Sequence, residues 1–399
     1  MKYEWKTKTL RELTSYISKG ITPKYTDNYS NSTIIVLNQK CNRNFKISYE
    51  YARFHDLSQK KVPHEKILKN GDILINSTGT GTAGRIAQIN NINQPVTIDG
   101  HMILMRPTKE VDNLYYGYAL KSQQKQIELF AEGSTGQTEI NKQRLINEIL
   151  ITYPSDIKIQ HYISSILSAL DDKIELNNKI NENLEMQAQA IFKSWFVDFE
   201  PFGGVMPEDW KIKDIYSIAN IIYGAPFKSK LFNTEKDGKP IVRIRDLKSN
   251  ELTTFTTEIH PKGYLIQNGD IVVGMDGEFK PYIWGNNEAW LNQRVCVFDN
   301  IRENGKFFLY LTIKPLLNIV EQTEVATTVI HIGKSDFDSF EINLPNENIL
   351  DKFDTITMPI YKLIVKNKLE NKRLAELRDT LLPKLMNGEI DVDDVQVKE

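Results

Sequence analysis

The sequence predicts an α+β protein in which two strand-rich mixed domains form a tandem repeat and each is followed by a long helix. Three observations lead to this fold class. A chain of 399 residues is too long for one ordinary core. Similar short segments recur about 200 residues apart. After Pro154 and again after Pro345, turn residues become rare and helical periodicity begins.

The repeat contains four kinds of segment in the same order. A tryptophan in an amphipathic stretch comes first, and a glycine turn with a nearby proline follows. An apolar strand ending in polar residues is third, and an Asn-Gly-Asp turn that leads into another strand is fourth. The matched pairs are residues 4–10 and 209–215, 19–23 and 223–226, 34–40 and 241–246, and 69–75 and 267–273. We therefore expect a first domain over 1–153, a helical region over 154–203, a second domain over 204–344 and a second helical region over 345–399.

Both helical regions carry an apolar seam interrupted by asparagine at the same two places. Ser155 and Asn346 are the predicted N-caps, and glycines at 203, 204 and 388 are the predicted stops. Each helix could pack only on its own domain, but the coinciding asparagines favour two helices that pair with each other, because a seam asparagine fixes register. Pro359 and Pro383 are expected to kink or break the second helix. The predicted pairing positions are Leu170, Ile174, Asn177, Asn181, Leu184 and Ile191 in the first helix, and Ile360, Ile364, Asn367, Asn371, Leu374 and Leu381 in the second.

Composition narrows the class of protein without deciding its function. No apolar run reaches the roughly 18–20 residues that span a bilayer, and the N-terminus lacks a secretory core, so we expect a cytoplasmic protein with no membrane partner. Cys41 and Cys296 lack a CxxC context and are predicted to be interior thiols. The net charge of −2 means that a nucleic-acid binder would have to concentrate its basic residues on one face.

Catalytic motifs are scarce. Residues 79–84 match G-x-G-x-x-G, but the following stretch looks like a strand and not the helix that a dinucleotide site needs. A glycine turn that approaches a phosphate closely is the preferred interpretation. There is no P-loop, no Asn-Pro-Pro-Tyr-like tetrapeptide, and no histidine beside a second metal ligand among His55, His64, His101, His161, His260 and His331. A nucleotide-binding enzyme that uses the glycine turn, and a stand-alone DNA-binding regulator, remain as alternatives.

Three segments carry a family resemblance. Residues 133–140, residues 157–163 with 170–174, and above all residues 377–390 resemble the specificity subunit of type I restriction–modification systems. The second domain departs from the pattern, since it has Ala326-Thr327-Thr328 where the first has a Gly-Ser-Thr-Gly-Gln loop.

The resemblance implies a non-catalytic DNA reader without a cofactor of its own. Each target-recognition domain would read one half of a split, asymmetric site in double-stranded DNA, and the helices would pair as an antiparallel coiled coil that sets the gap. Two modification subunits, which use S-adenosylmethionine to methylate adenine, would dock on the helices. Restriction subunits, which use ATP and Mg²⁺, would complete the complex.

Candidate DNA contacts lie in loops where basic, amide and hydroxyl side chains gather. Arginine pairs with guanine and asparagine or glutamine with adenine, whereas lysine, serine and threonine mostly contact phosphates. In the first domain the candidates are Lys24, Tyr25, Asn38, Gln39, Lys40, Arg43, Thr78, Thr80, Thr82, Arg85, Ser134, Thr135 and Gln137. In the second they are Lys228, Lys230, Arg243, Arg245, Lys248, Lys280, Gln293, Arg294, Thr327 and Thr328.

Overall fold

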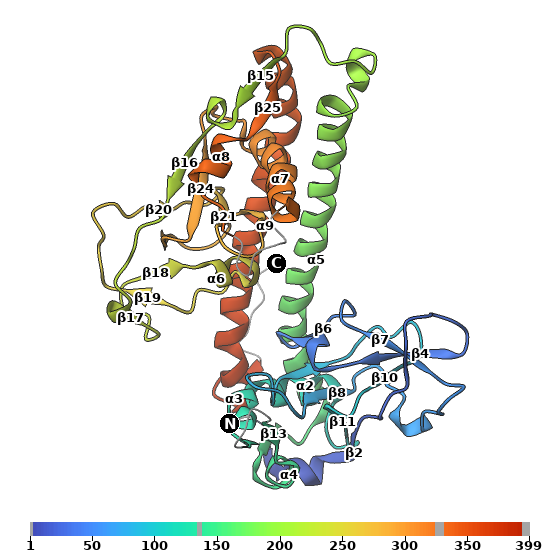
Figure 1. Cartoon of the computed structure of the whole chain (residues 1–399). Coiled ribbons are helices and arrows are strands. Elements are labelled where there is room, and N and C mark those ends of the chain that lie inside the picture. The colour runs from blue at the N-terminus through green and yellow to red at the C-terminus, as the bar shows by residue number, and fades with distance from the viewer. Residues whose placement is uncertain (1–2, 134–137, 324–330, 393–399) are drawn as a thin grey trace. The chain divides into compact units, whose positions relative to one another are not determined.

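The structure is a computed structural model that describes residues 3–133, 138–323 and 331–392. It divides into two compact units, one formed by residues 1–171 with 376–399 and the other by residues 172–375. Each unit contains one strand-rich domain and part of both long helices, α5 (Ile157–Phe196) and α9 (Glu347–Met386), which Figure 1 draws in green and red. The predicted fold class is therefore confirmed.

In the first unit, two four-stranded sheets form the body of the domain. One has the antiparallel order β2 (Thr14–Lys19), β11 (Met102–Pro107), β8 (Ile73–Asn76), β9 (Ile86–Gln88). The other has the order β10 (Val96–Ile98), β4 (Thr33–Leu37), β7 (Arg53–Asp56), β3 (Tyr25–Thr26), with β10 and β4 parallel. The paired short strands are β1 (Trp5–Thr9) with β14 (Leu150–Pro154), β5 (Asn42–Arg43) with β6 (Lys46–Ile47), and β12 (Ala131–Glu132) with β13 (Glu139–Ile140). The helices are α1 (Leu10–Leu13), α2 (Asn113–Ser122), α3 (Gln124–Glu128) and α4 (Lys142–Glu148), with 3-10 turns η1 (Gln39–Cys41) and η2 (His64–Lys66).

The second unit repeats this plan. One sheet has the antiparallel order β16 (Ala219–Tyr223), β24 (Val295–Asn300), β21 (Ile271–Gly274), β22 (Pro281–Ile283). The other has the order β17 (Phe232–Asn233), β19 (Phe255–Thr256), β18 (Lys239–Val242), β23 (Ala289–Leu291), β20 (Leu265–Ile266), and β15 (Lys211–Asp214) pairs with β25 (Glu341–Leu344). The helices are α6 (Ile244–Ser249), α7 (Lys306–Thr323) and α8 (Lys334–Asp338), with 3-10 turns η3 (Glu200–Phe202), η4 (Ile215–Ser217) and η5 (Ser229–Leu231).

The strand predicted over 241–246 is wrong in its second half. The strand β18 ends at Val242 and helix α6 begins at Ile244. Asp246 explains the change, because its side chain accepts a hydrogen bond of 3.0 Å from the backbone N–H of Arg243 and so caps the first turn of a helix.

Each main sheet has a central strand buried on both faces. Ile73 and Ile75 of β8 enter one apolar core, and Leu74 between them enters another. In the second unit, Ile271 and Val273 of β21 likewise share one core while Val272 enters a different one. Successive side chains of a strand point to opposite faces, so an uninterrupted apolar run is what such a strand requires.

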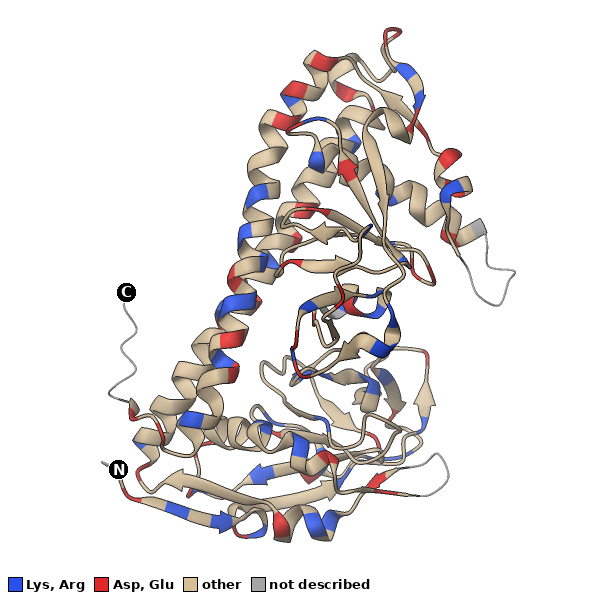
Figure 2. Ribbon diagram, turned by 90° about the vertical axis from the view of Figure 1, so that its left-hand side faces the viewer, with Lys and Arg blue, Asp and Glu red and all other residues tan. Residues whose placement is uncertain are grey.

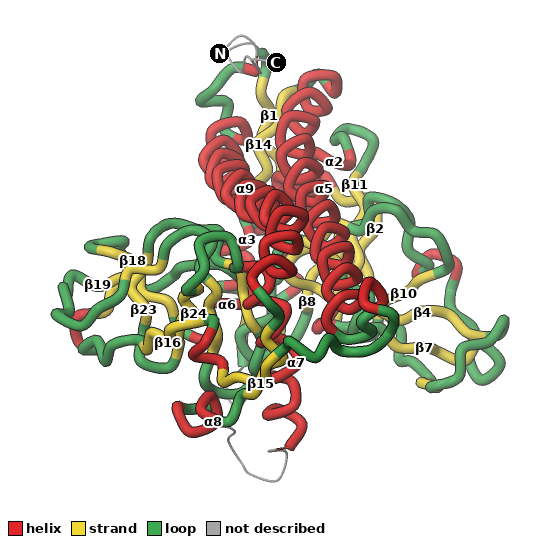
Figure 3. The backbone as a smooth tube through the Cα atoms, turned by 90° about the horizontal axis from the view of Figure 1, so that it is seen from above, coloured by secondary structure: helices red, strands yellow, loops and turns green. Residues whose placement is uncertain are grey.

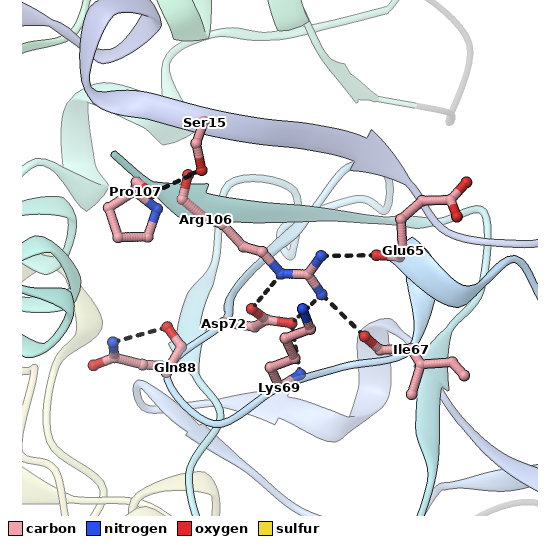
Figure 4. A network of polar contacts seen from close by, with 9 residues as sticks. Ser15, Glu65, Ile67, Lys69, Asp72, Gln88, Arg106 and Pro107 are labelled. Atoms are coloured by element: carbon pink, nitrogen blue, oxygen red, sulfur yellow. Dashed lines mark hydrogen bonds and ion pairs between the residues drawn. The ribbon is translucent and has the colours of Figure 1, made fainter. Parts of the chain in front are cut away.

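The Gly-Asp-Ile motif has a structural role. Gly71 has a φ of +87°, which favours glycine, and the predicted turn into a strand is confirmed. Asp72 is buried, and its carboxylate accepts two hydrogen bonds from the Arg106 guanidinium, at 2.7 and 2.8 Å. Arg106 also donates to the carbonyl oxygens of Glu65 and Ile67, at 2.8 and 2.9 Å (Figure 4). The aspartate thus orients an arginine that ties the segment around η2 to β11.

Both long helices begin just after the prolines, but only one predicted N-cap is right. Asn346 accepts a hydrogen bond of 3.0 Å from the N–H of Ile349 and caps α9 as expected. Ser155 does not cap α5; the following Asp156 does, by accepting from the N–H of Lys158 at 2.8 Å. The N–H of Ser155 instead donates to the carbonyl of Glu4, next to β1.

Pro359 and Pro383 do not break α9, which continues through both. Each proline removes one backbone donor, leaving the carbonyls of Thr355 and Asp379 without their usual partner. All four residues are exposed, so water can bind those carbonyls. The predicted break is therefore wrong.

Within the second unit, α5 and α9 lie side by side (Figure 3) and are joined by asparagines. The Nδ2 of Asn177 donates to the Oδ1 of Asn371 at 2.9 Å, and the Nδ2 of Asn367 donates to the Oδ1 of Asn181 at 2.8 Å. The earlier residue of one helix meets the later residue of the other, so the helices are antiparallel. Leu184, Ile191, Ile360 and Ile364 belong to the core of the second domain, so the seam also packs on a domain.

The remaining predicted seam positions lie at the edges of the cores. Leu381 packs against the core of the first unit, to which α5 contributes Ile163 and Leu167. Leu170, Ile174 and Leu374 are half-buried. Basic and acidic residues are interspersed along the long helices (Figure 2).

Replacing Asn181 with leucine should lower the free energy of unfolding by about 1–3 kcal/mol, because the buried amide of Asn367 would lose its acceptor. The double variant Asn181→Leu/Asn367→Leu should recover most of that loss. Chemical unfolding of the full chain measures both. Equal losses in the single and double variants would show that the unpaired amide of Asn367 costs nothing, contrary to this account.

Candidate nucleic-acid interface

The glycine turn of the first domain connects two strands of one sheet. Gly79, Gly81 and Gly84 have φ values of +116°, +69° and +87°, and the chain enters β9 directly afterwards. The Arg85 guanidinium donates to the carbonyl of Gly81 at 3.0 Å and closes the turn. A Cβ on Gly79 would lie 2.2 Å from the Oγ1 of Thr82. Since a strand follows where a dinucleotide site needs a helix, the turn does not support a nucleotide-binding enzyme.

A chain of polar contacts runs from this turn to the second sheet of the domain. Gln39 is the first member, since its Oε1 accepts from the Oγ1 of Thr78 at 3.5 Å. The Oγ1 of Thr78 lies 2.8 Å from the Nδ1 of His101. The backbone N–H of His101 donates to Asp99 at 2.9 Å, and the hydroxyl of Tyr25 reaches the same carboxylate at 3.4 Å. Three predicted contacts, Tyr25, Gln39 and Thr78, are thus brought together.

Burial and charge shift the pKa values of two members of this chain of polar contacts. Burial, reinforced by the nearby Asp99 carboxylate, raises the pKa of Tyr25 to about 12. Burial also raises the pKa of Asp99, against the opposing hydrogen bond from His101. The Arg53 guanidinium lies 3.7 Å from the centre of the Tyr25 ring. The tyrosine is therefore a neutral, positioned hydroxyl at neutral pH.

The other candidates of the first domain fall into three groups. Asn38 is engaged internally, since its amide donates to the carbonyl of Tyr51 at 2.6 Å. The Thr82 hydroxyl donates to the carbonyl of Thr78 at 3.4 Å. The exposed candidates are Lys24, Lys40, Arg43 and Thr80. Outside the described residues lie Ser134, Thr135 and Gln137.

In the second domain, three candidates pair with acidic side chains and five others are exposed. The Arg243 side chain hydrogen-bonds Thr254 and pairs with Asp246 at 3.6 Å, and Lys280 pairs with Glu278. The Arg294 guanidinium lies 3.7 Å from the carboxylate of Asp276. The remaining exposed candidates are Lys228, Lys230, Arg245, Lys248 and Gln293. Thr327 and Thr328 lie outside the described residues.

Several residues that the structure places beside the candidates are not among those predicted from the sequence. Asp99 and His101 complete the polar chain of the first domain, and in the second Asp276 pairs with both Arg294 and His331. One signal was available for Asp276, because it follows the Gly-Asp-Ile strand of the second repeat as Thr78 follows that of the first. His331 is distant in sequence and carried no local signal.

Other kinds of site find no support in the part of the chain that the structure describes. Over those residues no three His, Cys, Asp or Glu side chains are grouped as metal ligands. Both cysteines are buried and free, as predicted, and burial raises the pKa of the Cys296 thiol. A search of the described helices finds none that is both long and apolar enough to span a bilayer.

Comparison with known proteins decides the family. The model of the type I restriction modification DNA specificity domain matches residues 2–186 and again residues 207–378. The chain belongs to this family. The specificity subunit of the MjaIX type I restriction enzyme of Methanocaldococcus jannaschii is 27% identical, over 98% of this chain and 95% of that protein. That of the HindI enzyme of Haemophilus influenzae is 25% identical, over 97% and 100%.

A solved relative shares the fold. The crystal structure of a type I system S subunit from M. genitalium matches with a TM-score of 0.54 and 18% identity, over 96% of both chains. The resemblance to type I specificity subunits is therefore confirmed. As a specificity subunit, this chain recognises DNA sequence through two tandem domains and is itself non-catalytic.

The helical motifs at residues 170–174 and 377–390, which resemble the specificity family, contact each other. Asp171, from the first motif, accepts a hydrogen bond of 2.5 Å from Arg378, which lies in the C-terminal motif. The same carboxylate accepts from the Tyr118 hydroxyl at 2.7 Å and lies 3.7 Å from Lys121. All four residues belong to the first unit, so these motifs fix both helices to the first domain.

Proposed function

We propose that this specificity subunit reads a bipartite, asymmetric site in double-stranded DNA, one half with each domain, and directs adenine methylation or cleavage by partner subunits. The observation that carries the proposal is the match of one DNA specificity domain twice along the chain, over 2–186 and 207–378. The repeated domains have the same sheet order, except for the additional strand β20 in the second, but different polar side chains in their loops, as two readers of different half-sites require.

The proposed DNA surface includes the polar chain of the first domain and the exposed candidates of both. Tyr25, Gln39, Thr78 and Arg85 lie on segments that side-chain and backbone hydrogen bonds connect. Lysines at positions 24 and 40 supply charge for the phosphates nearby. In the second domain, the proposed surface includes Arg294, and the lysines at 228 and 230 supply charge for the phosphates.

The helices are proposed to set the gap between half-sites and to dock two modification subunits. Their antiparallel asparagine contacts support a fixed register. The exposed residues of both helices include charges of both signs, which suit a polar protein interface. Under this proposal, S-adenosylmethionine, ATP and Mg²⁺ act in the modification and restriction subunits.

Mapping adenine methylation in a host genome, with and without this gene, tests the function. The gene should be expressed with its modification subunits, and one bipartite asymmetric motif should appear only when it is present. An unchanged methylation map would contradict the proposal. Tight site-specific binding by the isolated chain, without any effect on methylation, would instead identify a stand-alone regulator.

A further inference from the structure

Two loops, one in each domain, are held by the same backbone contacts. In the first domain, the N–H of Ser77 donates to the carbonyl of His101 at 2.8 Å. The N–H of Ile140 donates to the carbonyl of Ser77 at 2.8 Å, and Thr78 and Glu139 form an antiparallel bridge. The segments after β8, before β11 and in β13 therefore meet at one point.

The second domain repeats these contacts bond for bond. The N–H of Met275 donates to the carbonyl of Arg294 at 2.9 Å. The N–H of Ile332 donates to the carbonyl of Met275 at 3.0 Å, and Asp276 and His331 form an antiparallel bridge. Each contact links elements in the same places of the repeat, after β21 and before β24. The repeat thus defines three equivalent positions in each domain.

The side chains at these equivalent positions differ in chemistry. In the first domain they are Thr78, His101 and Glu139, and the threonine and histidine form a hydrogen bond of 2.8 Å. In the second they are Asp276, Arg294 and His331. The carboxylate there lies 3.7 Å from the Nη1 of the arginine and 2.5 Å from the Nδ1 of the histidine. Conserved backbone geometry with changed side chains is what reading different bases requires.

Exposure separates the roles within the second domain. The Asp276 side chain is 25% exposed, whereas those of Arg294 and His331 are 56% and 52% exposed. The carboxylate is thus recessed and the guanidinium faces outward. Among the described residues, Asp276 is the polar side-chain partner of Arg294, which leaves the Nε and Nη2 donors for a ligand.

The recessed carboxylate favours a base over a phosphate as that ligand. A phosphate bound to the arginine would be repelled by Asp276, since like charges close together are unfavourable. The O6 and N7 acceptors of guanine are neutral, and they match the planar fork of an arginine that is already oriented by an acid.

We propose that Arg294 reads a guanine in the half-site of the second domain, with Asp276 and His331 as positioning residues. This inference rests on the proposed function. It adds the identity of one recognised base, and it makes His101 the residue at the equivalent reading position of the first domain.

Competition binding with the assembled methyltransferase complex tests the inference. The target duplex is compared with duplexes in which each guanine of the second half-site is replaced in turn. For one guanine, the wild-type complex should discriminate by about 5- to 150-fold. With Arg294→Ala, that ratio should fall to near 1 while the ratios at all other positions stay unchanged. Asp276→Asn should lower the same ratio partially, without changing the melting temperature.

Two further variants sharpen the result. Arg294→Gln should move the preference at that position from guanine toward adenine, because glutamine pairs with the adenine edge. Lys239→Ala is the matched control, since Lys239 is another exposed cation of the same domain and pairs with Glu288 at 3.0 Å. It should leave every ratio unchanged.

The outcomes distinguish this inference from the function on which it rests. A wild-type complex that binds the target duplex no better than a duplex of unrelated sequence would overturn the proposed function itself. If the complex prefers its target but tolerates every guanine replacement, only the guanine assignment is wrong. If the wild type is specific but Arg294→Ala keeps every discrimination ratio, the guanine assignment is wrong. Uniform weakening with intact ratios would make Arg294 a phosphate contact and would also overturn the inference.

Discussion

Replacing Asp171 with alanine should destabilise the first unit by about 3–5 kcal/mol, because it leaves the largely buried Lys121 without its acid and removes one of the two carboxylates that pair with Arg378. The side chains of Lys121, Asp171 and Arg378 are only 16%, 19% and 18% exposed. Burial lowers the pKa of Lys121, so its charged form depends on the aspartate. Burial alone would raise the pKa of Asp171, but Lys121 and Arg378 outweigh it, and the pKa is lowered.

Hydrogen exchange of the α2 amides in the full chain measures this loss, because α2 carries Lys121. The matched control is Asp172→Ala, which removes the exposed neighbouring acid and should change stability by no more than about 0.5 kcal/mol. Similar protection in the two variants would show that the ion cluster does not fix the helices to the domain.

The same cluster predicts a pH dependence. The pKa of Asp171 is lower in the folded than in the unfolded chain, so its stabilisation is present above the unfolded value of about 4 and disappears as the pH falls through the folded value. The wild-type protein should therefore lose more stability in acid than Asp171→Asn does. A parallel loss in both proteins would contradict the assignment.

Inserting four residues directly after Asp172 should lengthen the gap between the two half-sites and leave their sequences unchanged. Four helical residues add about 6 Å and nearly one turn, close to two base-pair steps of about 3.4 Å. The asparagine contacts of α5 with α9 are spaced four residues apart, at Asn177 and Asn181, so the seam can pair again one turn along. The methylated motif should keep both halves while its gap grows by one or two base pairs.

A two-residue insertion at the same place is the contrasting variant. It rotates the seam by about 200° relative to the start of α5, where Ile163 and Leu167 are buried in the first unit. Either these residues or the asparagines must then leave their partners, and methylation should be lost. A four-residue insertion that leaves both gap and activity unchanged would show that the spacing comes from the modification subunits.

Strong local patterns in the sequence predicted the fold well. Three features could be predicted because their partners follow from the sequence pattern. They are the glycines of the Gly-Asp-Ile turns, the asparagines that pair at matching places of the two helices, and the N-cap Asn346. Predictions failed where one side chain changed the outcome, as when Asp246 converted an apparent strand into α6. The tolerated prolines of α9 depended on exposure, which periodicity does not reveal.

The candidate site was harder to predict because its members come from distant segments. Tyr25, Asp99 and His101 meet through sheet pairing, and His331 reaches Asp276 through a bridge across 55 positions. Loop composition identified Thr78 and Arg294 as candidates but could not show which neighbours orient them. The equivalence of His101 with Arg294, and of Glu139 with His331, becomes visible only in the backbone contacts of the two domains.

Exchange of the first recognition domain tests the central claim, that the two domains read DNA independently, most directly. Residues 1–150 are replaced with those of a related specificity subunit, and both long helices are kept because the core of the first unit includes Leu382 and Leu385 of α9. The methylated motif should then change in one half only, with the other half and its spacing preserved. A change in both halves, or in neither, would contradict independent reading by two domains.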